Sequence, residues 1–186
     1  MRITGGRLGR RRITGPPTDK TRPTTDRVRE ALFSALASRM DLREARVLDL
    51  FAGTGALGLE AISRGAAHAT FVDSHGPTLG IARRNARDLD VADQCTFVRA
   101  EALAHIARLG PEAGAPGRFD LVLADPPYAL DALADLPARL RPLLASGGLL
   151  ALEHDARHDF SADPACAFSR DYGTTRVSIF EVETPS

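Results

Sequence analysis

The sequence predicts an α/β protein whose central, mostly parallel sheet is covered by helices on both faces. From residue 45 onward, short apolar stretches alternate with segments of helical periodicity, which is typical of repeated strand–helix units. The stretches 121–123 and 149–152 are continuously apolar, as expected for parallel strands that are buried on both faces. Near the end, two strands that flank Tyr172-Gly173-Thr174 predict an antiparallel hairpin at one edge of the sheet.

The first 40 residues predict an extension that precedes this sheet. A turn that contains glycine predicts a small β-hairpin with strands at 2–4 and 11–14, and glycine and prolines predict a loop at 15–23. Helical spacing of apolar residues predicts a helix at 25–40. Along that helix the apolar positions form one stripe, and Arg27, Arg29 and Glu30 lie off it. We therefore divide the chain into a basic N-terminal arm, residues 1–23, and one domain, residues 24–186, which begins with the helix.

The rest of the chain supplies a seven-stranded sheet. We expect strands at 45–50, 69–73, 95–100, 119–124, 148–153, 165–171 and 175–183, and helices that end near Gly65 or cover 77–89, 101–109 and 131–144. Ligands of such sheets bind beyond the carboxyl ends of the strands, where the strand order reverses. The loops after Leu50, Val72, Ala100 and Ala124 are therefore where we expect the functional residues.

Composition narrows the class of protein. The chain has 186 residues, of which 44% are hydrophobic, so one domain can bury a core that needs neither disulfides nor metals. Cys95 and Cys166 are too few and too distant for a disulfide framework, and no apolar stretch suggests a membrane helix or a secretion signal. His154 and His158 are four residues apart, but we place them in a loop without a third ligand. We expect a cytoplasmic protein with no metal and no membrane partner.

Charge is distributed unevenly along the chain. Residues 1–43 carry 11 Lys+Arg and 4 Asp+Glu, whereas the remaining 143 residues carry 13 and 20, although the net charge is zero. Such asymmetry favours a basic arm that meets nucleic acid. A segment that is merely solvated, or that docks on the acidic body, would have the same composition.

A glycine-rich loop and an acidic residue follow the first two strands. Gly53-Thr54-Gly55-Ala56-Leu57-Gly58 lies between a strand and a helix, where glycines allow a tight turn and a close approach to a ligand. Asp73 ends the next strand, 20 residues after Gly53, and a carboxylate there can accept hydrogen bonds from both ribose hydroxyls of an adenosine. This pairing fits either a dinucleotide or an S-adenosyl cofactor.

The segment Asp125-Pro126-Pro127-Tyr128 follows the fourth strand and separates these alternatives. The prolines hold the backbone extended, so that a peptide carbonyl near Pro126 and the Asp125 carboxylate become two convergent acceptors. Two such acceptors suit a planar exocyclic amine, and Tyr128 offers a ring on which a base can stack. The segment therefore indicates chemistry on the amino group of a nucleobase.

These motifs resemble those of amino-group methyltransferases that use S-adenosylmethionine (SAM), which have a Rossmann-like class I fold. The sequence further resembles the bacterial small-subunit ribosomal RNA guanine-N2 methyltransferases in segments 2–6, 22–33, 55–61 and 63–66. The resemblance therefore covers nearly the whole chain. Segment 22–33 is the specific part, because other methyltransferases lack it. The sequence departs from this family at Gly9-Arg10-Arg11, where Arg-Gly-Arg is more common, and at Glu101, where relatives carry Asn or Asp.

The resemblance implies transfer of a methyl group from SAM to N2 of one guanine in small-subunit rRNA, within an assembled or assembling particle. Nothing in the sequence demands a dimer, so we expect a monomer. The catalytic residues implied are Asp125, Pro126, Pro127 and Tyr128. For the cofactor the resemblance implies Asp49, Phe51, Gly53, Gly55, Asp73, Ser74, Glu101 and Ala102. For RNA it implies Arg2, Arg10, Arg11, Arg12, Arg22, Thr24 and Arg27, with Arg22 and Arg27 at the mouth of the pocket or else paired with Asp26 or Glu30.

Three other functions remain as alternatives. A DNA adenine or cytosine amino methyltransferase would share Asp125-Pro126-Pro127-Tyr128, but this chain leaves no room for a separate DNA-reading domain. A non-catalytic RNA-binding assembly factor would not need the intact residues Asp49, Gly53, Gly55 and Asp125. A nicotinamide dehydrogenase would leave the Asp-Pro-Pro-Tyr segment without a function.

Overall fold

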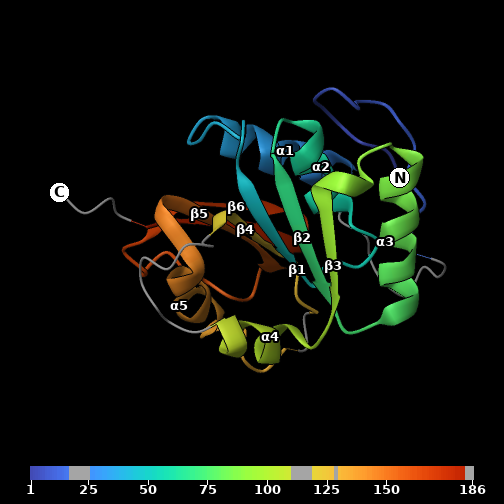
Figure 1. The fold of residues 1–186 in the computed structure, drawn as a ribbon. Helices are drawn as coiled ribbons and strands as arrows, with labels where there is room; N and C mark the ends of the chain where they lie inside the picture. The colour runs from blue at the N-terminus through green and yellow to red at the C-terminus, as the bar shows by residue number, and fades with distance from the viewer. Residues whose placement is uncertain (17–25, 110–118, 128–129, 183–186) are drawn as a thin grey trace.

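The computed structural model describes residues 1–16, 26–109, 119–127 and 130–182. These residues form an α/β fold on one seven-stranded sheet, as predicted, with strand order β3-β2-β1-β4-β5-β7-β6 (Figure 1). The first five strands in that order are parallel, and β7 is antiparallel to both of its neighbours. The strands are β1 (Arg46–Leu50), β2 (His68–Asp73), β3 (Cys95–Arg99), β4 (Phe119–Ala124), β5 (Leu144–Asp155), β6 (Cys166–Tyr172) and β7 (Thr175–Glu181).

Helices cover both faces of the sheet. The helices are α1 (Asp26–Ala37), α2 (Ala56–Ser63), α3 (Gly76–Asp88), α4 (Ala102–Leu109) and α5 (Leu136–Leu140), with short 3₁₀ turns at Ala92–Gln94 and Arg141–Leu143. Helices α1, α2 and α3 pack against one face, and α4 and α5 against the other (Figure 1). Because side chains alternate along a strand, Val47 of β1 joins the first core and Leu48 joins the second.

One predicted helix and one predicted strand end at other residues than expected, and a proline and strand pairing explain these two ends. The expected helix at 131–144 is α-helical only from Leu136 to Leu140, because Pro142 has no N–H to continue the helix. Strand β5 extends to Asp155 through its pairing with β7, so His154 lies in a strand and not in a loop. The His154 ring is fully buried, with Nε2 2.9 Å from Ser178 Oγ. A histidine held in this way belongs to the core.

The predicted N-terminal hairpin is present, but it has a single bridge, between Arg2 and Arg12, in place of two regular strands. Its apolar side chains, Ile3, Leu8 and Ile13, are buried in the same core as α1 and α2. Gly6 adopts φ +72°, and a Cβ at this position would lie 2.0 Å from the Ser63 carbonyl oxygen of α2. The hairpin therefore lies directly against the main domain, and only glycine allows this approach.

Buried charged side chains join the hairpin to the domain. Glu60 of α2 accepts hydrogen bonds from the Thr4 N–H at 2.7 Å, the Thr4 hydroxyl at 2.8 Å and the Gly5 N–H at 2.8 Å. Arg29 is fully buried, donates to Glu60 and the Arg2 carbonyl, and pairs with Asp26 at 2.7 Å. The expectation that Arg29 lies off the buried stripe of α1 is wrong, because the docked hairpin covers that side of the helix.

Candidate active site

The strand order reverses between β1 and β4, which are parallel neighbours paired from Val47–Leu121 to Leu50–Ala124. From β1 the chain continues to β2 on one side, whereas β4 leads to β5 on the other. In open α/β sheets, ligands bind beyond the carboxyl ends of the strands at this point. The segments 51–55 and 125–127 follow β1 and β4 at this point.

Among the described residues, no helix has the length and apolar character required to span a membrane.

The loop after β1 is folded by left-handed residues. Phe51, Gly53 and Gly55 have φ values of +59°, +53° and +80°, and Gly55 is the N-cap of α2. The Ala52 N–H donates to the Val72 carbonyl at 3.1 Å, which fixes the loop against the end of β2. Phe51 is not a glycine, so its conformation costs on the order of 1–3 kcal/mol. Strain of this kind is concentrated at ligand-binding segments.

Gly58 sets how closely α2 approaches the sheet. A Cβ at Gly58 would lie 2.3 Å from Phe71 Cε1 and 3.0 Å from Asp49 Oδ2. Gly58→Ala is therefore expected to lower the free energy of unfolding by about 1–3 kcal/mol, because the new methyl overpacks a dense core. Gly80→Ala in α3 is the matched control: nothing lies within 4 Å of its Cβ, and we expect a gain of about 0.5–1 kcal/mol. Denaturant titration of both variants tests this, and equal stabilities would contradict it.

Asp73 connects two loops at this edge. Its Oδ2 accepts a hydrogen bond from the Gly53 N–H at 2.7 Å, and its Oδ1 accepts one from the His75 N–H at 2.7 Å. Each carboxylate oxygen has a second lone pair, so Asp73 retains one acceptor site per oxygen. The predicted pairing of the glycine loop with Asp73 is therefore a direct contact. It leaves two acceptors for a pair of hydroxyl groups.

The Asp-Pro-Pro segment continues β4 across the same edge. Asp125 is half-buried, Pro126 is buried and Pro127 is exposed, and the Pro127 carbonyl accepts a hydrogen bond from the Leu130 N–H at 2.9 Å. No described residue donates to the Pro126 carbonyl. Tyr128, predicted to stack on a base, lies outside the described residues. The segment brings a carboxylate and a peptide carbonyl to the edge that also holds the glycine loop and Asp73.

Comparison with known proteins identifies the family. A family model described as "Conserved hypothetical protein 95" matches residues 1–181. Ribosomal RNA small subunit methyltransferase D of Escherichia coli (strain K12) is 35% identical over 167 residues, which cover 89% of this chain and 80% of that protein. The chain belongs to the ribosomal RNA small subunit methyltransferase D family. YlbH of Bacillus subtilis (strain 168) is 33% identical over 97% of this chain and 98% of its own length.

A solved structure agrees with the sequence comparison. The structure of yhhF from Escherichia coli has a TM-score of 0.80 with 30% sequence identity, and the match covers 100% of this chain and 99% of that one. The predicted fold class is confirmed: this member of the methyltransferase D family has the Rossmann-like class I fold with an antiparallel hairpin at the end. The extra N-terminal hairpin is included in the matched length.

Asp49 is the buried carboxyl of the site. It is 1% exposed, and its Oδ2 accepts a hydrogen bond from the Gly58 N–H at 2.9 Å. Burial raises the pKa of Asp49 to about 7, the Gly58 hydrogen bond opposes that rise, and the charge of Asp73 adds to it. In this methyltransferase the carboxyl therefore changes charge close to neutral pH. Sequence reasoning found the residue but not this property, because burial depends on α2 and β2 covering it.

Asp49→Asn is expected to change how stability depends on pH. A carboxyl whose pKa is raised in the folded state binds protons more tightly there than in the unfolded chain, so it lowers stability as pH rises from about 4 to about 7. The amide oxygen of Asn can still accept from Gly58 without a buried charge. Relative to wild type, Asp49→Asn should gain at least about 1 kcal/mol between pH 4 and pH 8. Urea unfolding at several pH values measures this, and a constant difference would contradict it.

The other cofactor-binding residues predicted from the sequence lie at the ends of β2 and β3. Ser74 follows Asp73 and is exposed. Glu101 follows β3 and is exposed, and its carbonyl accepts the His105 N–H at 2.9 Å in the first turn of α4. Ala102 begins α4 and is buried. The structure thus places all three at the loops that follow the parallel strands.

The structure divides the predicted RNA-binding arginines into two groups. Arg2 pairs with Asp26 at 3.3 Å, and Arg11 donates to the Asp88 and Leu89 carbonyls at the end of α3. Arg10, Arg12 and Arg27 are exposed and form no ion pair with any described residue. Arg22 and Thr24 lie outside the described residues. Asp26, considered above as a partner of Arg27, pairs instead with Arg2 and Arg29.

Proposed function

We propose that this protein transfers the methyl group of SAM to the exocyclic N2 amine of one guanine in small-subunit ribosomal RNA. The observation that carries the proposal is the meeting of the glycine loop, Asp73 and Asp125-Pro126 at one edge of the sheet, in a chain of the methyltransferase D family. We further propose that the protein acts as a monomer. The substrate form that we favour is the RNA within an assembled or assembling particle.

The residues at this edge fit SAM. At Gly53 and Gly55 the turn brings backbone without side chains to the ligand position, and the second lone pairs of the Asp73 oxygens suit the two ribose hydroxyls of an adenosine. Asp49, when ionised, provides negative charge near a cofactor that carries a cationic sulfonium. When bound, SAM supplies an electrophilic methyl group. Glu101 and Ala102, after β3, would meet the adenine end.

The protein's own contribution to the reaction comes from two hydrogen-bond acceptors in the Asp-Pro-Pro segment. The Asp125 carboxylate and the Pro126 carbonyl can each accept one N–H of the guanine amine, which turns the nitrogen lone pair toward the incoming methyl. The same two oxygens stabilise the positive charge that develops on nitrogen. The target base must leave its stack to enter the site, and Tyr128 would hold it there by stacking. No strong base is needed before transfer.

The basic N-terminal arm would hold the RNA backbone. Arg10 and Arg12 are exposed on the hairpin, and Arg27 is exposed at the start of α1, so each can contact phosphate. Arg2 and Arg11 are already engaged within the protein and would contribute mainly by fixing the hairpin. Phosphate contacts of this kind make affinity strongly dependent on salt.

The decisive experiment is methyl transfer with identification of the product. The protein is incubated with labelled SAM and small ribosomal subunits that lack the modification, and the digested RNA is analysed by mass spectrometry. Labelled N2-methylguanosine is the expected product, and fragment mapping then gives its position. Label on adenosine or cytidine would contradict the base assignment, and absence of label with SAM still bound would contradict the proposed activity. DNA offered in parallel tests the DNA-modifying alternative directly.

A further inference from the structure

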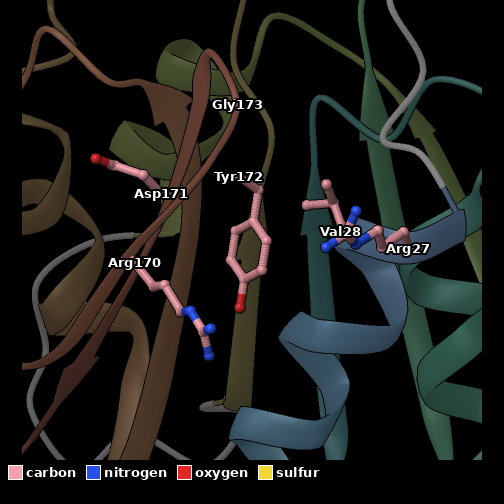
Figure 2. A pocket seen from close by; sticks show the side chains of 6 residues that line it. All are labelled: Arg27, Val28, Arg170, Asp171, Tyr172 and Gly173. Atoms are coloured by element: carbon pink, nitrogen blue, oxygen red, sulfur yellow. The ribbon is translucent and has the colours of Figure 1, made fainter.

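A cavity of about 340 Å³ lies between the start of α1 and the turn that joins β6 to β7. It is lined by Arg27, Val28, Arg170, Asp171, Tyr172 and Gly173, and Figure 2 shows the Tyr172 ring between β6 and α1. A volume near the lower end of the range for ligand pockets suits a single nucleotide. None of these residues belongs to the cofactor site described above, and only Arg27 was expected to bind RNA.

The alternation of β6 decides which side chains face this cavity. Arg170 and Tyr172 are two residues apart and therefore lie on the same face of the strand, whereas Asp171 lies on the other (Figure 2). The Arg170 guanidinium carbon lies 5.7 Å from the centroid of the Tyr172 ring. Asp171 is bound by Arg176 of β7, at 2.5 Å and 3.1 Å, so its charge is compensated. The cavity thus presents an aromatic ring with an adjacent cation.

The remaining charge at the cavity is positive. Neither Arg27 nor Arg170 forms an ion pair with any described residue, and both are exposed. Asp26, adjacent to Arg27, already pairs with Arg2 and Arg29. Val28 and the Tyr172 ring supply an apolar wall between the two guanidinium groups. An aromatic surface flanked by arginines that form no ion pair with a described residue suits a nucleotide, because the ring stacks on a base and the guanidinium groups bind phosphate.

The cavity lies at the same edge of the sheet as the candidate active site. Ala124, which precedes Asp125, pairs with Leu152 of β5, and three residues further on Asp155 pairs with Thr175 next to the β6–β7 turn. Strands β4 and β6 are three strand spacings apart, or about 14 Å. A short run of unpaired nucleotides spans this distance. RNA entering the active site can therefore reach the cavity.

We propose that Tyr172, Arg170 and Arg27 form a subsite that binds an unpaired nucleotide flanking the target guanine. The base stacks on Tyr172, and its phosphates lie between Arg170 and Arg27. This inference rests on the proposed function, since it assigns the subsite to the same RNA substrate. It predicts that the subsite contributes to RNA binding and leaves cofactor binding and the chemical step unchanged.

Steady-state kinetics with unmodified small ribosomal subunits tests the subsite. Tyr172→Ala is expected to raise KM for the particle about tenfold with kcat and SAM affinity unchanged, because stacking is lost from binding alone. Tyr172→Phe retains the ring and should restore a KM near that of wild type. Arg170→Ala removes an exposed side chain from an edge strand and should raise KM without affecting folding.

Arg83→Ala is the matched control for Arg170→Ala. The Arg83 guanidinium also lies over an aromatic ring, 5.3 Å from the centroid of Phe97, but it is on α3 beside the opposite end of the sheet. The affinity of wild type for the RNA is expected to fall with salt, and Arg170→Ala should reduce the slope of log K against log salt by about 0.7, the value for one phosphate contact in single strands. Arg83→Ala should leave both KM and the slope unchanged.

Ultraviolet cross-linking with peptide mass spectrometry gives a readout that does not require catalysis. A cross-link from RNA to the peptide that contains Tyr172 supports the subsite, even if the wild-type protein methylates a different base or none. The proposed subsite would be overturned if Tyr172→Ala and Arg170→Ala both kept the KM and the salt slope of the wild type. Cross-links confined to other peptides would also overturn it. Failure of methyl transfer by wild type would instead contradict the proposed function.

Discussion

Asp125→Ala is expected to lower kcat for methyl transfer by about 100–1000-fold while SAM affinity stays close to that of wild type. This is the loss seen when one fixed group that stabilises developing charge is removed from an active site. In the structure, Asp125 continues β4 beside the Pro126 carbonyl, to which no described residue donates, across the edge from the glycine loop. Removing the carboxylate leaves one acceptor, which cannot orient an amine by itself. Single-turnover kinetics and calorimetric titration with SAM measure the two quantities separately.

Two further variants make this experiment specific. Asp125→Asn keeps one oxygen acceptor but adds a donor facing the amine, so an intermediate loss is expected. Asp120→Asn is the control from the same strand: Asp120 accepts the Arg46 N–H at 2.8 Å at the opposite end of β4, and its substitution should not change kcat. Full activity in Asp125→Ala would exclude the amine-positioning role. A parallel loss of SAM affinity would assign the residue to cofactor binding.

Glu60→Gln is expected to lower the free energy of unfolding by about 3–5 kcal/mol. Glu60 and Arg29 are both fully buried, so neutralising Glu60 removes the buried partner of Arg29 and leaves its charge with the partly exposed Asp26 alone. The side-chain amide would also direct donor hydrogens at the N–H groups of Thr4 or Gly5. Urea unfolding gives the overall loss. Hydrogen exchange at Thr4 and Gly5 should report release of the hairpin at lower denaturant than the sheet.

The control for this prediction is an exposed pair. Asp41 and Arg43 also form a salt bridge, but both are exposed, so Asp41→Asn should leave stability unchanged. If Glu60→Gln were as stable as wild type, the hairpin would be held by its apolar contacts alone. If Glu60→Gln bound RNA more weakly but bound SAM normally, docking of the N-terminal hairpin would be needed for RNA binding.

The β-strands of the domain could be predicted closely because their signal is local. An apolar run such as Leu121-Val122-Leu123 identifies a strand buried on both faces, whatever surrounds it. The helix at 131–144 was less predictable, since its apolar spacing indicated a helix while Pro142 ended the α-helical part at Leu140. The extent of β5 could not be predicted, because pairing with β7 carries it to Asp155 and buries His154.

Candidate site residues could be proposed from the sequence where they are adjacent in the chain. Gly53, Gly55 and Asp125-Pro126-Pro127 form contiguous motifs, and the contact between Gly53 and Asp73 follows from parallel pairing of β1 with β2. Arg170 and Tyr172 carry no motif of their own. They become a candidate subsite only because the β6–β7 turn lies beside the start of α1.

The amino-acid order was sufficient to predict the α/β class, the edge of the sheet at which the candidate site lies and its glycine loop, because turn residues and apolar periodicity act over short distances. Three properties depend on the tertiary structure: Arg29 is buried against Glu60, the pKa of Asp49 is raised to about 7, and Arg27 lines the same cavity as Tyr172. Burial, compensation of charge and proximity depend on which segments pack together, and those segments lie far apart along the chain.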